Sequence, residues 1–380
     1  MTAPLVYLIA GEPSGDILAA RLMRAMRQLG PVEFAGVGGE AMREEGLVSL
    51  FPQADLAVMG FAEVVPRIPK ILRRLRETLA DIEARKPDLI VTIDSWGFTG
   101  RVTKRLKQMG STVPRLHYVA PMVWAWKETR ARQLAERVDR LLCLLPNEPA
   151  YFEKHGLKAV HVGHPVLEAQ RGDGAAFRAR HQIPAGAKLL CLLPGSRHSE
   201  TSRLLPVFLA TARLLGPDLR LVIPSVETVA AEVAAAASAS GLSIVMLDQR
   251  EKWDCFAACD AALAASGTVA LELAVAQLPM VIAYKVAPAT AMIIRRLLTV
   301  KYVSLLNLLV DRPVVPELLQ ENCTAEKLSV ALLPLLQDGA ARQIQLAGCA
   351  EALAALGVEG ESPSRRAARE AFQMIEENAK

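Results

Sequence analysis

Short, continuous apolar runs alternate along this chain with longer stretches in which apolar residues recur at helical spacing. In the first half the apolar runs are LVYLIAG, VEFAGVG, DLIVTID, RLHYVAP, RLLCLLP and AVHVGH. In the second half they are KLLCLLPGS, LRLVIPS, LSIVMLD, AALAASG and PMVIAYK. Such runs, separated by amphipathic segments, are typical of buried parallel strands joined by crossover helices. The pattern therefore predicts an α/β protein.

The pattern starts afresh near the middle of the chain, and 380 residues are too many for one ordinary core. We interpret the polar, non-periodic segment 165–188 as the linker between two doubly wound, Rossmann-like domains that face each other across a cleft. The expected domains are 1–165 and 166–361. A Ser-Pro-Ser break at Ser362 starts a last helix, about 362–380, which we expect to return to the first domain.

Composition excludes several classes of protein. A net charge of +4 is too small and too dispersed to predict a nucleic-acid partner. No apolar window approaches the ~18 residues of a membrane-spanning helix, and the first residues lack the features of a secretory signal. Cys255 and Cys259 have no nearby His or Cys pair to complete a zinc site, and His161 and His164 lie at a strand-to-loop junction. We expect a cytoplasmic protein with no metal and no cofactor.

The first predicted strand ends in GEPSGD, residues 11–16. Two glycines let backbone approach a ligand closely, and the free amides at the start of the following helix favour an anion or a polar group. A plain strand-to-helix turn is the alternative. The segment GVGGEA at 36–41 fits a dinucleotide-binding pattern, but it follows the second strand and lacks an acid placed for a ribose, so we do not assign it to a cofactor.

Two loops of the second half suit a nucleoside diphosphate. LLPGSR places a Gly-Ser-Arg loop (195–197) after a buried strand, and a guanidinium matches phosphate oxygens. In ASGTVALE, Ser266 or Thr268 caps a helix whose free amides point the same way, and Glu272 is placed to reach ribose hydroxyls. A solvated arginine and an acid that merely complements the helix dipole are the alternatives. Together the loops predict a site that needs no metal.

Two further features of the first half carry chemistry. Asp94 ends the strand DLIVTID, where a carboxylate suits a general base that removes a hydroxyl proton; capping of the next helix is the alternative. The segment VVPRIPKILRRLRETL at 64–79 interleaves basic and apolar residues. Such a segment suits an anionic membrane surface, and a solvated basic helix is the alternative.

Eight segments, in this order from about Leu5 to beyond Leu336, resemble the lipid-A-disaccharide synthase family. They are GEPSGD, AVMGFAEV, HYVAPMVWAW, VGHP, LLPGSR, ASGTVALE, YVSLLNLL and ELLQENCTAEKL. The resemblance implies an inverting glycosyltransferase of the GT-B type. It would move 2,3-diacylglucosamine from UDP onto 2,3-diacylglucosamine 1-phosphate, make a β(1→6) linkage and release UDP.

The resemblance also implies roles for individual residues. The catalytic residues would be Asp94, Asn307 and Arg197. The UDP contacts would be Gly195, Ser196, Arg197, Ser266, Gly267, Thr268 and Glu272. The acceptor contacts would be Gly11, Glu12, Ser14, Gly15 and Asp16. The membrane contacts would be Val64, Val65, Arg67, Ile68, Lys70, Ile71, Leu72, Arg73 and Arg76. This chain departs from the family pattern at two places. After Asp94 the family usually has Pro-Asp-Phe-Asn or similar, where this chain has Trp96, Gly97, Phe98 and Thr99 and so lacks the second acid, and Leu306 stands where the family usually has proline.

A lipid substrate places the expected enzyme peripherally on the inner face of the inner membrane of a Gram-negative bacterium. The sequence leaves open whether the chain forms a homodimer. The rival class with the same architecture is a UDP-sugar epimerase, which works on one soluble substrate. A non-enzymatic sugar-binding protein is a third class, but it normally carries an export signal.

Overall fold

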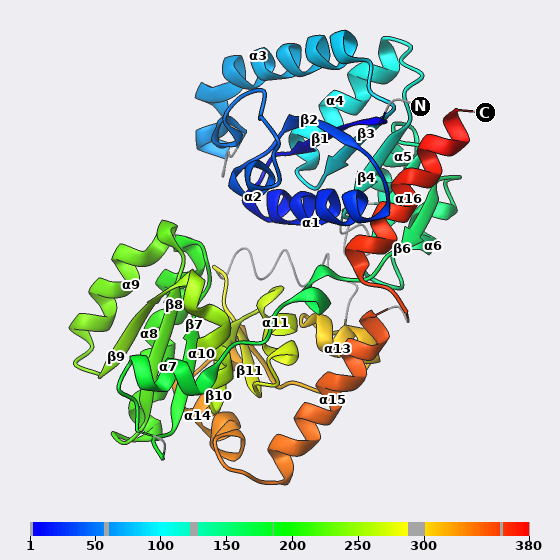
Figure 1. Ribbon diagram of the computed structural model, residues 1–380. Coiled ribbons are helices and arrows are strands. Elements are labelled where there is room, and N and C mark those ends of the chain that lie inside the picture. Colours follow the sequence, from blue (N-terminus) through cyan, green and yellow to red (C-terminus); the bar gives the residue numbers. More distant parts are fainter. Residues whose placement is uncertain are drawn as a thin grey trace. The chain divides into compact units, whose positions relative to one another are not determined.

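The computed structural model describes residues 3–56, 61–121, 128–184, 186–287, 301–357 and 360–379, with the side chains of 61–67 and 128 left undescribed. The chain folds into two compact units (Figure 1). The first comprises 1–165 together with 357–380, and the second comprises 166–356.

A six-stranded parallel sheet forms the centre of the first unit. Its strands are β1 (Leu5–Ala10), β2 (Glu33–Val37), β3 (Leu89–Ile93), β4 (Arg115–Tyr118), β5 (Arg140–Cys143) and β6 (Lys158–His161). Their order in the sheet is β2-β1-β3-β4-β5-β6. The six apolar runs of the first half all form strands, as predicted.

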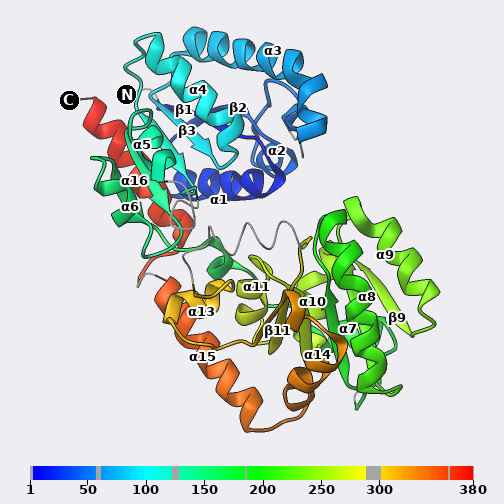
Figure 2. The ribbon, with the colours of Figure 1, turned by 180° about the vertical axis from the view of Figure 1, so that it is seen from behind.

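Helices cover both faces of this sheet (Figures 1 and 2). They are α1 (Pro13–Leu29), α2 (Glu40–Glu44), α3 (Phe61–Arg85), α4 (Trp96–Gln108), α5 (Glu128–Ala135), α6 (Pro149–Glu153) and α16 (Pro363–Asn378), with a short 3-10 turn at Gln53–Asp55. Alternate residues of a strand point to opposite faces. Val6 and Leu8 therefore pack in the core formed with α1 and α16, whereas Tyr7 and Ile9 pack in the core formed with α3 and α4.

The last helix, α16, belongs to the first unit although it follows the second in sequence. Its apolar residues Ala367, Ala368 and Ala371 are buried in the same core as those of α1. The buried Arg140 of β5 donates hydrogen bonds to Glu370 at 2.9 Å and to Glu377 at 2.7 Å, which ties the helix to the sheet. The prediction that the C-terminal helix returns to the first domain is confirmed.

A second six-stranded parallel sheet forms the centre of the second unit. Its strands are β7 (Leu189–Leu193), β8 (Arg220–Ser225), β9 (Ile244–Asp248), β10 (Ala261–Ala265), β11 (Met280–Tyr284) and β12 (Glu317–Leu319). Their order is β12-β11-β10-β7-β8-β9. The sequence predicted five of these strands and missed β12, whose three residues are too few to show a pattern.

The helices of the second unit are α7 (Gly174–Arg180), α8 (His198–Leu215), α9 (Glu227–Ala239), α10 (Lys252–Ala258), α11 (Val269–Val275), α13 (Leu305–Val310), α14 (Ala325–Leu332) and α15 (Ala340–Leu356). Short 3-10 turns lie at Pro165–Glu168, Gln249–Glu251, Gln320–Asn322 and Leu333–Leu335. The helices α8, α9 and α14 share one core with the sheet. The boundary between the units falls at the start of the segment 165–188 that we interpreted as the linker, but most of this segment belongs to the second unit and contains α7, which the side chain of Asp173 caps.

Candidate active site

Each sheet has one point at which the order of its strands reverses, next to the strand with which the sheet starts. Loops singled out in the sequence follow the strands at these two points. In the first sheet the chain runs from β1 outward to β2 and then returns to the other side of β1 with β3, where Ala10 pairs with Ile93. In the second sheet it returns to the other side of β7 with β10, where Leu193 pairs with Ala264. Open α/β sheets bind ligands at such switch points, outside the carboxyl ends of the strands.

Asp94 stands at the first switch point in a strained backbone. Asp94 and the next residue, Ser95, both have left-handed φ angles, of 46° and 44°, and Val119 at the end of β4 has a φ of 83°. The amide of Asp94 donates to the carbonyl of Tyr118 at 2.9 Å, which holds the two strand ends together. Strained residues gather at functional sites because the surrounding fold over-determines their conformation.

The carboxylate of Asp94 is not used to cap α4. Ser95 is the N-cap residue of that helix, and its side chain makes no capping hydrogen bond. Within the described ranges, the structure gives the Asp94 carboxylate no hydrogen bond and no ion pair. The capping alternative therefore loses its support, and the carboxylate is free to act on a ligand.

Trp96, which departs from the family pattern, supports the start of α4. Its ring packs edge-on against His117 with the centroids 5.2 Å apart, and the guanidinium of Arg137 lies 5.7 Å from the ring centroid. Burial lowers the pKa of His117 to about 3, so this imidazole is neutral at pH 7 and accepts or donates one hydrogen bond with Thr92 at 2.8 Å. The residue that replaces proline thus has a packing role behind Asp94.

The GEPSGD loop lies beside Asp94 because β1 and β3 are neighbours. A Cβ atom on Gly11 would come within 2.9 Å of the Cβ of Ser95, so this close approach of the two loops requires glycine. Glu12 and Ser14 are exposed at the start of α1, whereas Gly15 is buried against Ile93. Among the predicted acceptor contacts, Glu12 and Ser14 are the side chains placed to meet a ligand.

Asp16, also predicted as an acceptor contact, has a different task. Its buried carboxylate accepts hydrogen bonds from the amides of Gly39 at 2.7 Å, Ala41 at 2.9 Å and Met42 at 3.2 Å. Both oxygens are thus used to cap α2, and we reassign Asp16 to the structure of the loop. The same contacts occupy the amides of Gly39 and Ala41 in GVGGEA, and Ser49 accepts from the amide of Gly38, so these donors are not available to a cofactor phosphate.

The Gly-Ser-Arg loop after β7 is held in shape by a residue that the sequence analysis missed. Gly195 has a φ of 112°, which favours glycine. Glu200, one turn into α8, accepts a hydrogen bond from the amide of Ser196 at 3.1 Å and pairs with Arg197 at 3.2 Å. The side chain of Arg197 is nevertheless 61% exposed, so its guanidinium can meet a phosphate.

The neighbouring Ser-Gly-Thr loop follows β10. Thr268 is the N-cap residue of α11, although its side chain makes no capping hydrogen bond. The carboxylate of Glu272 accepts hydrogen bonds from the Nζ of Lys252 at 2.9 and 3.0 Å. The sequence does not reveal that Lys252 is the partner of Glu272. Lys252 begins α10, which precedes β10 in the chain, whereas Glu272 lies in α11, which follows β10. The ion pair fixes where the carboxylate points.

Asn307, predicted to be catalytic, is buried and fully hydrogen-bonded. Its Nδ2 donates to the carbonyl of Val315 at 2.9 Å and to Glu317 at 2.7 Å, and its Oδ1 accepts from the amide of Val315 at 2.9 Å. Glu317 also accepts from the amides of Val303 and Ser304, each at 2.9 Å. These contacts join α13 to the segment before β12, and they use both protons of the Asn307 amide.

The segment predicted to contact a membrane lies in the amphipathic helix α3. Val64, Val65 and Arg67 lie outside the residues whose side chains are described. Ile68 and Leu72, one turn apart, are 43% and 47% exposed. No helix in the described ranges of the chain has the length and apolar composition of a membrane span.

The basic residues of α3 fall into two groups. Lys70 forms an ion pair with Asp55, and Arg74 pairs with Asp55 and Glu77 at 2.6 Å each, so these two cations tie α3 to its own unit. Arg73 pairs at 2.8 Å with Glu77 but keeps most of its side chain exposed, and Arg76 is exposed as well. Within residues 68–79, Arg73 and Arg76 are therefore the described cations that no ion pair joins to another element of the unit.

Solved structures that resemble this chain include a glycosyltransferase and a putative UDP-sugar epimerase. A glycosyltransferase of kitacinnamycin matches with a TM-score of 0.65 and 16% identity over 99% of this chain and 100% of that chain. A putative UDP-N-acetylglucosamine 2-epimerase from Listeria monocytogenes matches with a TM-score of 0.66 and 13% identity over 100% and 97%. At such identities the likeness defines the GT-B-like fold and leaves open which of the two activities the chain has.

The sequence decides between them. The family model described as lipid-A-disaccharide synthetase matches residues 6–372. A lipid-A-disaccharide synthase from Paramagnetospirillum magneticum is 59% identical over 98% of this chain and 97% of its own length. The chain belongs to the lipid-A-disaccharide synthase family.

Replacing Asp16 tests its reassignment. Asp16→Ala leaves three amides of α2 without their acceptor, so we expect the free energy of unfolding to fall by about 1–3 kcal/mol. Chemical denaturation measures this loss, and Glu12→Ala, at an exposed position of the same loop, is the control that should leave stability unchanged. Unchanged stability of Asp16→Ala together with a raised KM for the acceptor would return Asp16 to the substrate contacts.

Proposed function

We propose that this chain transfers 2,3-diacylglucosamine from UDP to the 6-hydroxyl of 2,3-diacylglucosamine 1-phosphate with inversion at the anomeric carbon. Family membership makes the chain a glycosyltransferase that forms the lipid A disaccharide from a sugar nucleotide and a lipid phosphate. The observation that carries the proposal is the position of the family's motif residues at the switch points of both sheets. The epimerase alternative shares the fold and not the sequence.

Asp94 is the proposed general base. Its carboxylate stands at the carboxyl edge of β3, without an internal partner among the described residues, beside the exposed Glu12 and Ser14 of the acceptor loop. In the proposed step the acceptor's 6-oxygen forms a bond to the anomeric carbon, the bond from that carbon to the UDP oxygen breaks, and the hydroxyl proton moves to Asp94. Attack opposite the departing UDP inverts the configuration.

Arg197 and the loop after β10 are proposed to hold the UDP group. The exposed guanidinium of Arg197 offers paired donors to the diphosphate, whose charge grows as it leaves. Gly195, Ser196, Ser266, Gly267 and Thr268 bring backbone close to the same edge of the sheet, and Glu272, aimed by Lys252, accepts from the ribose hydroxyls. Because Arg197 supplies positive charge at the diphosphate, we propose that no divalent cation is required.

The proposed part of Asn307 is to position the chain and not to touch the substrate. Its amide and the carboxylate of Glu317 organise the start of α13. The loss of this side chain would therefore act through the backbone of the second unit.

The exposed part of α3 is proposed as the membrane contact of the enzyme. Ile68 and Leu72 provide apolar side chains for the interfacial region, and Arg73 and Arg76 lie on the same helix for anionic headgroups. The substrates' acyl chains require that the enzyme meet a bilayer surface. Homodimer formation carries no part of this proposal.

Replacing the base is the first test of the proposed function. Asp94→Asn removes the proton acceptor but keeps the shape of the side chain, so turnover should fall by about 10² or more while UDP binding stays close to normal. Turnover is measured with UDP-2,3-diacylglucosamine and its 1-phosphate acceptor, with Glu83→Gln, an exposed site on α3, as the control. Near-normal turnover of Asp94→Asn would remove the residue from this role.

Chelation tests the proposed independence from metal. Activity in excess EDTA should stay within about twofold of the untreated enzyme, because Arg197 and the backbone amides stabilise the leaving diphosphate. Arg197→Ala should lower turnover with and without EDTA alike. Loss of activity in EDTA that Mg²⁺ or Mn²⁺ restores would contradict the proposal.

Two variants of α3 test the membrane contact. Arg73→Ser with Arg76→Ser should weaken sedimentation with anionic vesicles, since each basic residue near such a surface contributes about 1 kcal/mol, and added salt should reduce the difference. Arg365→Ser with Arg369→Ser on α16 makes the same charge change as a control. Ile68→Ser with Leu72→Ser should lower turnover of long-chain substrates more than of short-chain analogues. Parent-like vesicle binding by both α3 variants would place the membrane contact elsewhere.

A further inference from the structure

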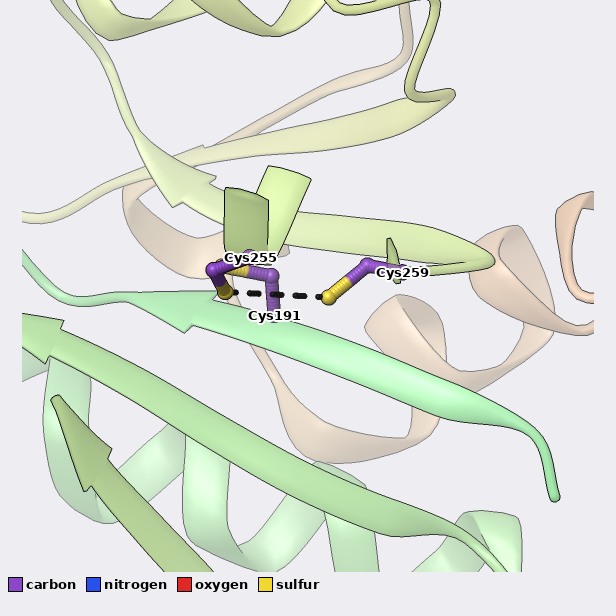
Figure 3. Close-up of side chains that lie close together, drawn as sticks. All are labelled: Cys191, Cys255 and Cys259. Carbon is purple, nitrogen blue, oxygen red and sulfur yellow. Dashed lines mark hydrogen bonds between the residues drawn. The ribbon is translucent and has the colours of Figure 1, made fainter. Parts of the chain in front are cut away.

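Three thiols meet in the second unit, on the face of the sheet opposite α8 (Figure 3). Cys191 comes from β7, Cys255 from α10, and Cys259 is the residue that ends α10. The three sulfur atoms all lie within 4.8 Å of one another, and those of Cys255 and Cys259 are 3.9 Å apart. Cys255 and Cys259 are close in the sequence. The third thiol, that of Cys191, is about 60 residues away in the chain and lies near them only in the folded protein.

The spacing suits a metal ion bound by three sulfur atoms. In a planar three-coordinate site with metal–sulfur bonds of about 2.3 Å, the sulfur atoms stand about 4.0 Å apart. The cluster needs only a small adjustment to reach this separation. Among the described residues, no further Cys, His, Asp or Glu joins the group, so the tetrahedral set of four ligands that a structural zinc site takes is not provided.

The frame around α10 holds the thiols in place without a metal. Backbone approaches α10 so closely at Gly172 and Gly174 that a Cβ atom there would lie 2.1 Å from the carbonyl oxygen of Trp253 and 2.4 Å from that of Ala257. The amide of Asp173 donates to Asp254 at 2.8 Å. Little rearrangement is therefore available to separate the thiols, and a preorganised set of ligands binds a metal without the cost of ordering it.

Sulfur atoms are the ligands that the cluster offers to a metal ion. The guanidinium of Arg178 donates to the carbonyl of Ala258 at 3.0 and 2.7 Å and pairs with Asp260 at 3.3 Å, so its charge is balanced beside Cys259. Thiolate sulfur is the ligand that soft cations prefer.

We propose that Cys191, Cys255 and Cys259 form a binding site for one soft monovalent cation, Cu(I), in three-coordinate sulfur geometry. On binding, each thiol that still carries its proton releases it to solvent and forms a bond to copper, with no change in oxidation state. The ion enters beside Cys259, which has 8% of its surface exposed, whereas Cys191 and Cys255 are fully buried. The metal would link α10 to β7, and α10 begins at Lys252, the partner of Glu272.

The test is an anaerobic titration of the full-length protein with Cu(I) against the chelator bicinchoninate. We expect one Cu(I) per chain, with affinity at least about 100-fold lower in Cys191→Ser and in Cys255→Ser and unchanged in Cys349→Ser, a buried cysteine of α15 outside the cluster. UDP binding reports whether each variant is folded. Failure of the protein to retain Cu(I), or equal retention by the cluster variants, would overturn the proposal.

X-ray absorption of the copper-loaded parent protein is a second measurement that does not depend on the variants folding. Three sulfur neighbours at a single distance are expected. Two-coordinate copper, or a shell that includes nitrogen or oxygen, would overturn the proposal. The Cu(I) titration and the X-ray absorption measurement use neither lipid substrates nor turnover. They therefore test the copper site independently of the proposed transferase reaction.

Discussion

The strand order of the two parallel sheets is the constraint on which the candidate site depends. Each sheet starts from one strand, grows to one side and then returns to the other side of the starting strand. Right-handed crossovers place the helices before and after this reversal on opposite faces of the sheet. The two loops that leave the neighbouring strands therefore run in opposite directions, which opens a crevice at the carboxyl ends of those strands. The fully buried residues of β1, β3, β7 and β10 stabilise this arrangement. The left-handed backbone at Asp94 and Ser95 persists because β3 holds one end of it, α4 holds the other, and the amide of Asp94 is bonded to the end of β4.

Carboxylates that accept hydrogen bonds from nearby amides shape the loops at this edge. Asp16 caps α2, Glu200 accepts from the Gly-Ser-Arg loop, and Glu317 gathers the amides before α13. Each stabilises its loop through charge-assisted hydrogen bonds, which are stronger than those between neutral groups. Asp94 is an acid on the same kind of loop, but its carboxylate has no such task among the described residues. An acidic residue of a motif whose oxygens already accept hydrogen bonds from the protein therefore has a structural role. One whose oxygens accept none is the candidate for a role in catalysis.

The sequence was sufficient for most of the fold, because the strands and the loops that follow them depend on local patterns. Continuous apolar runs mark buried parallel strands, and loops that follow strands end up at the carboxyl edge whatever lies between them. The strand β12 and the helix α7 escaped because three and seven residues are too few to show periodicity. The roles of Asp16 and Asn307 escaped for another reason. Their partners, Gly39 and Val315, are contacts of the folded chain that no spacing in the sequence reveals.

The difference between the sheets and their loops also explains why the fold alone could not identify the reaction. Two packed parallel sheets of this order tolerate extensive replacement of apolar residues, so a glycosyltransferase and an epimerase at 16% and 13% identity retain the architecture. The loops at the switch points do not tolerate such replacement, because Gly195 needs a left-handed φ and Gly11 leaves no space for a side chain beside Ser95. Agreement in those loops, which a family match over residues 6–372 includes, therefore carries information about chemistry that agreement in the sheets does not.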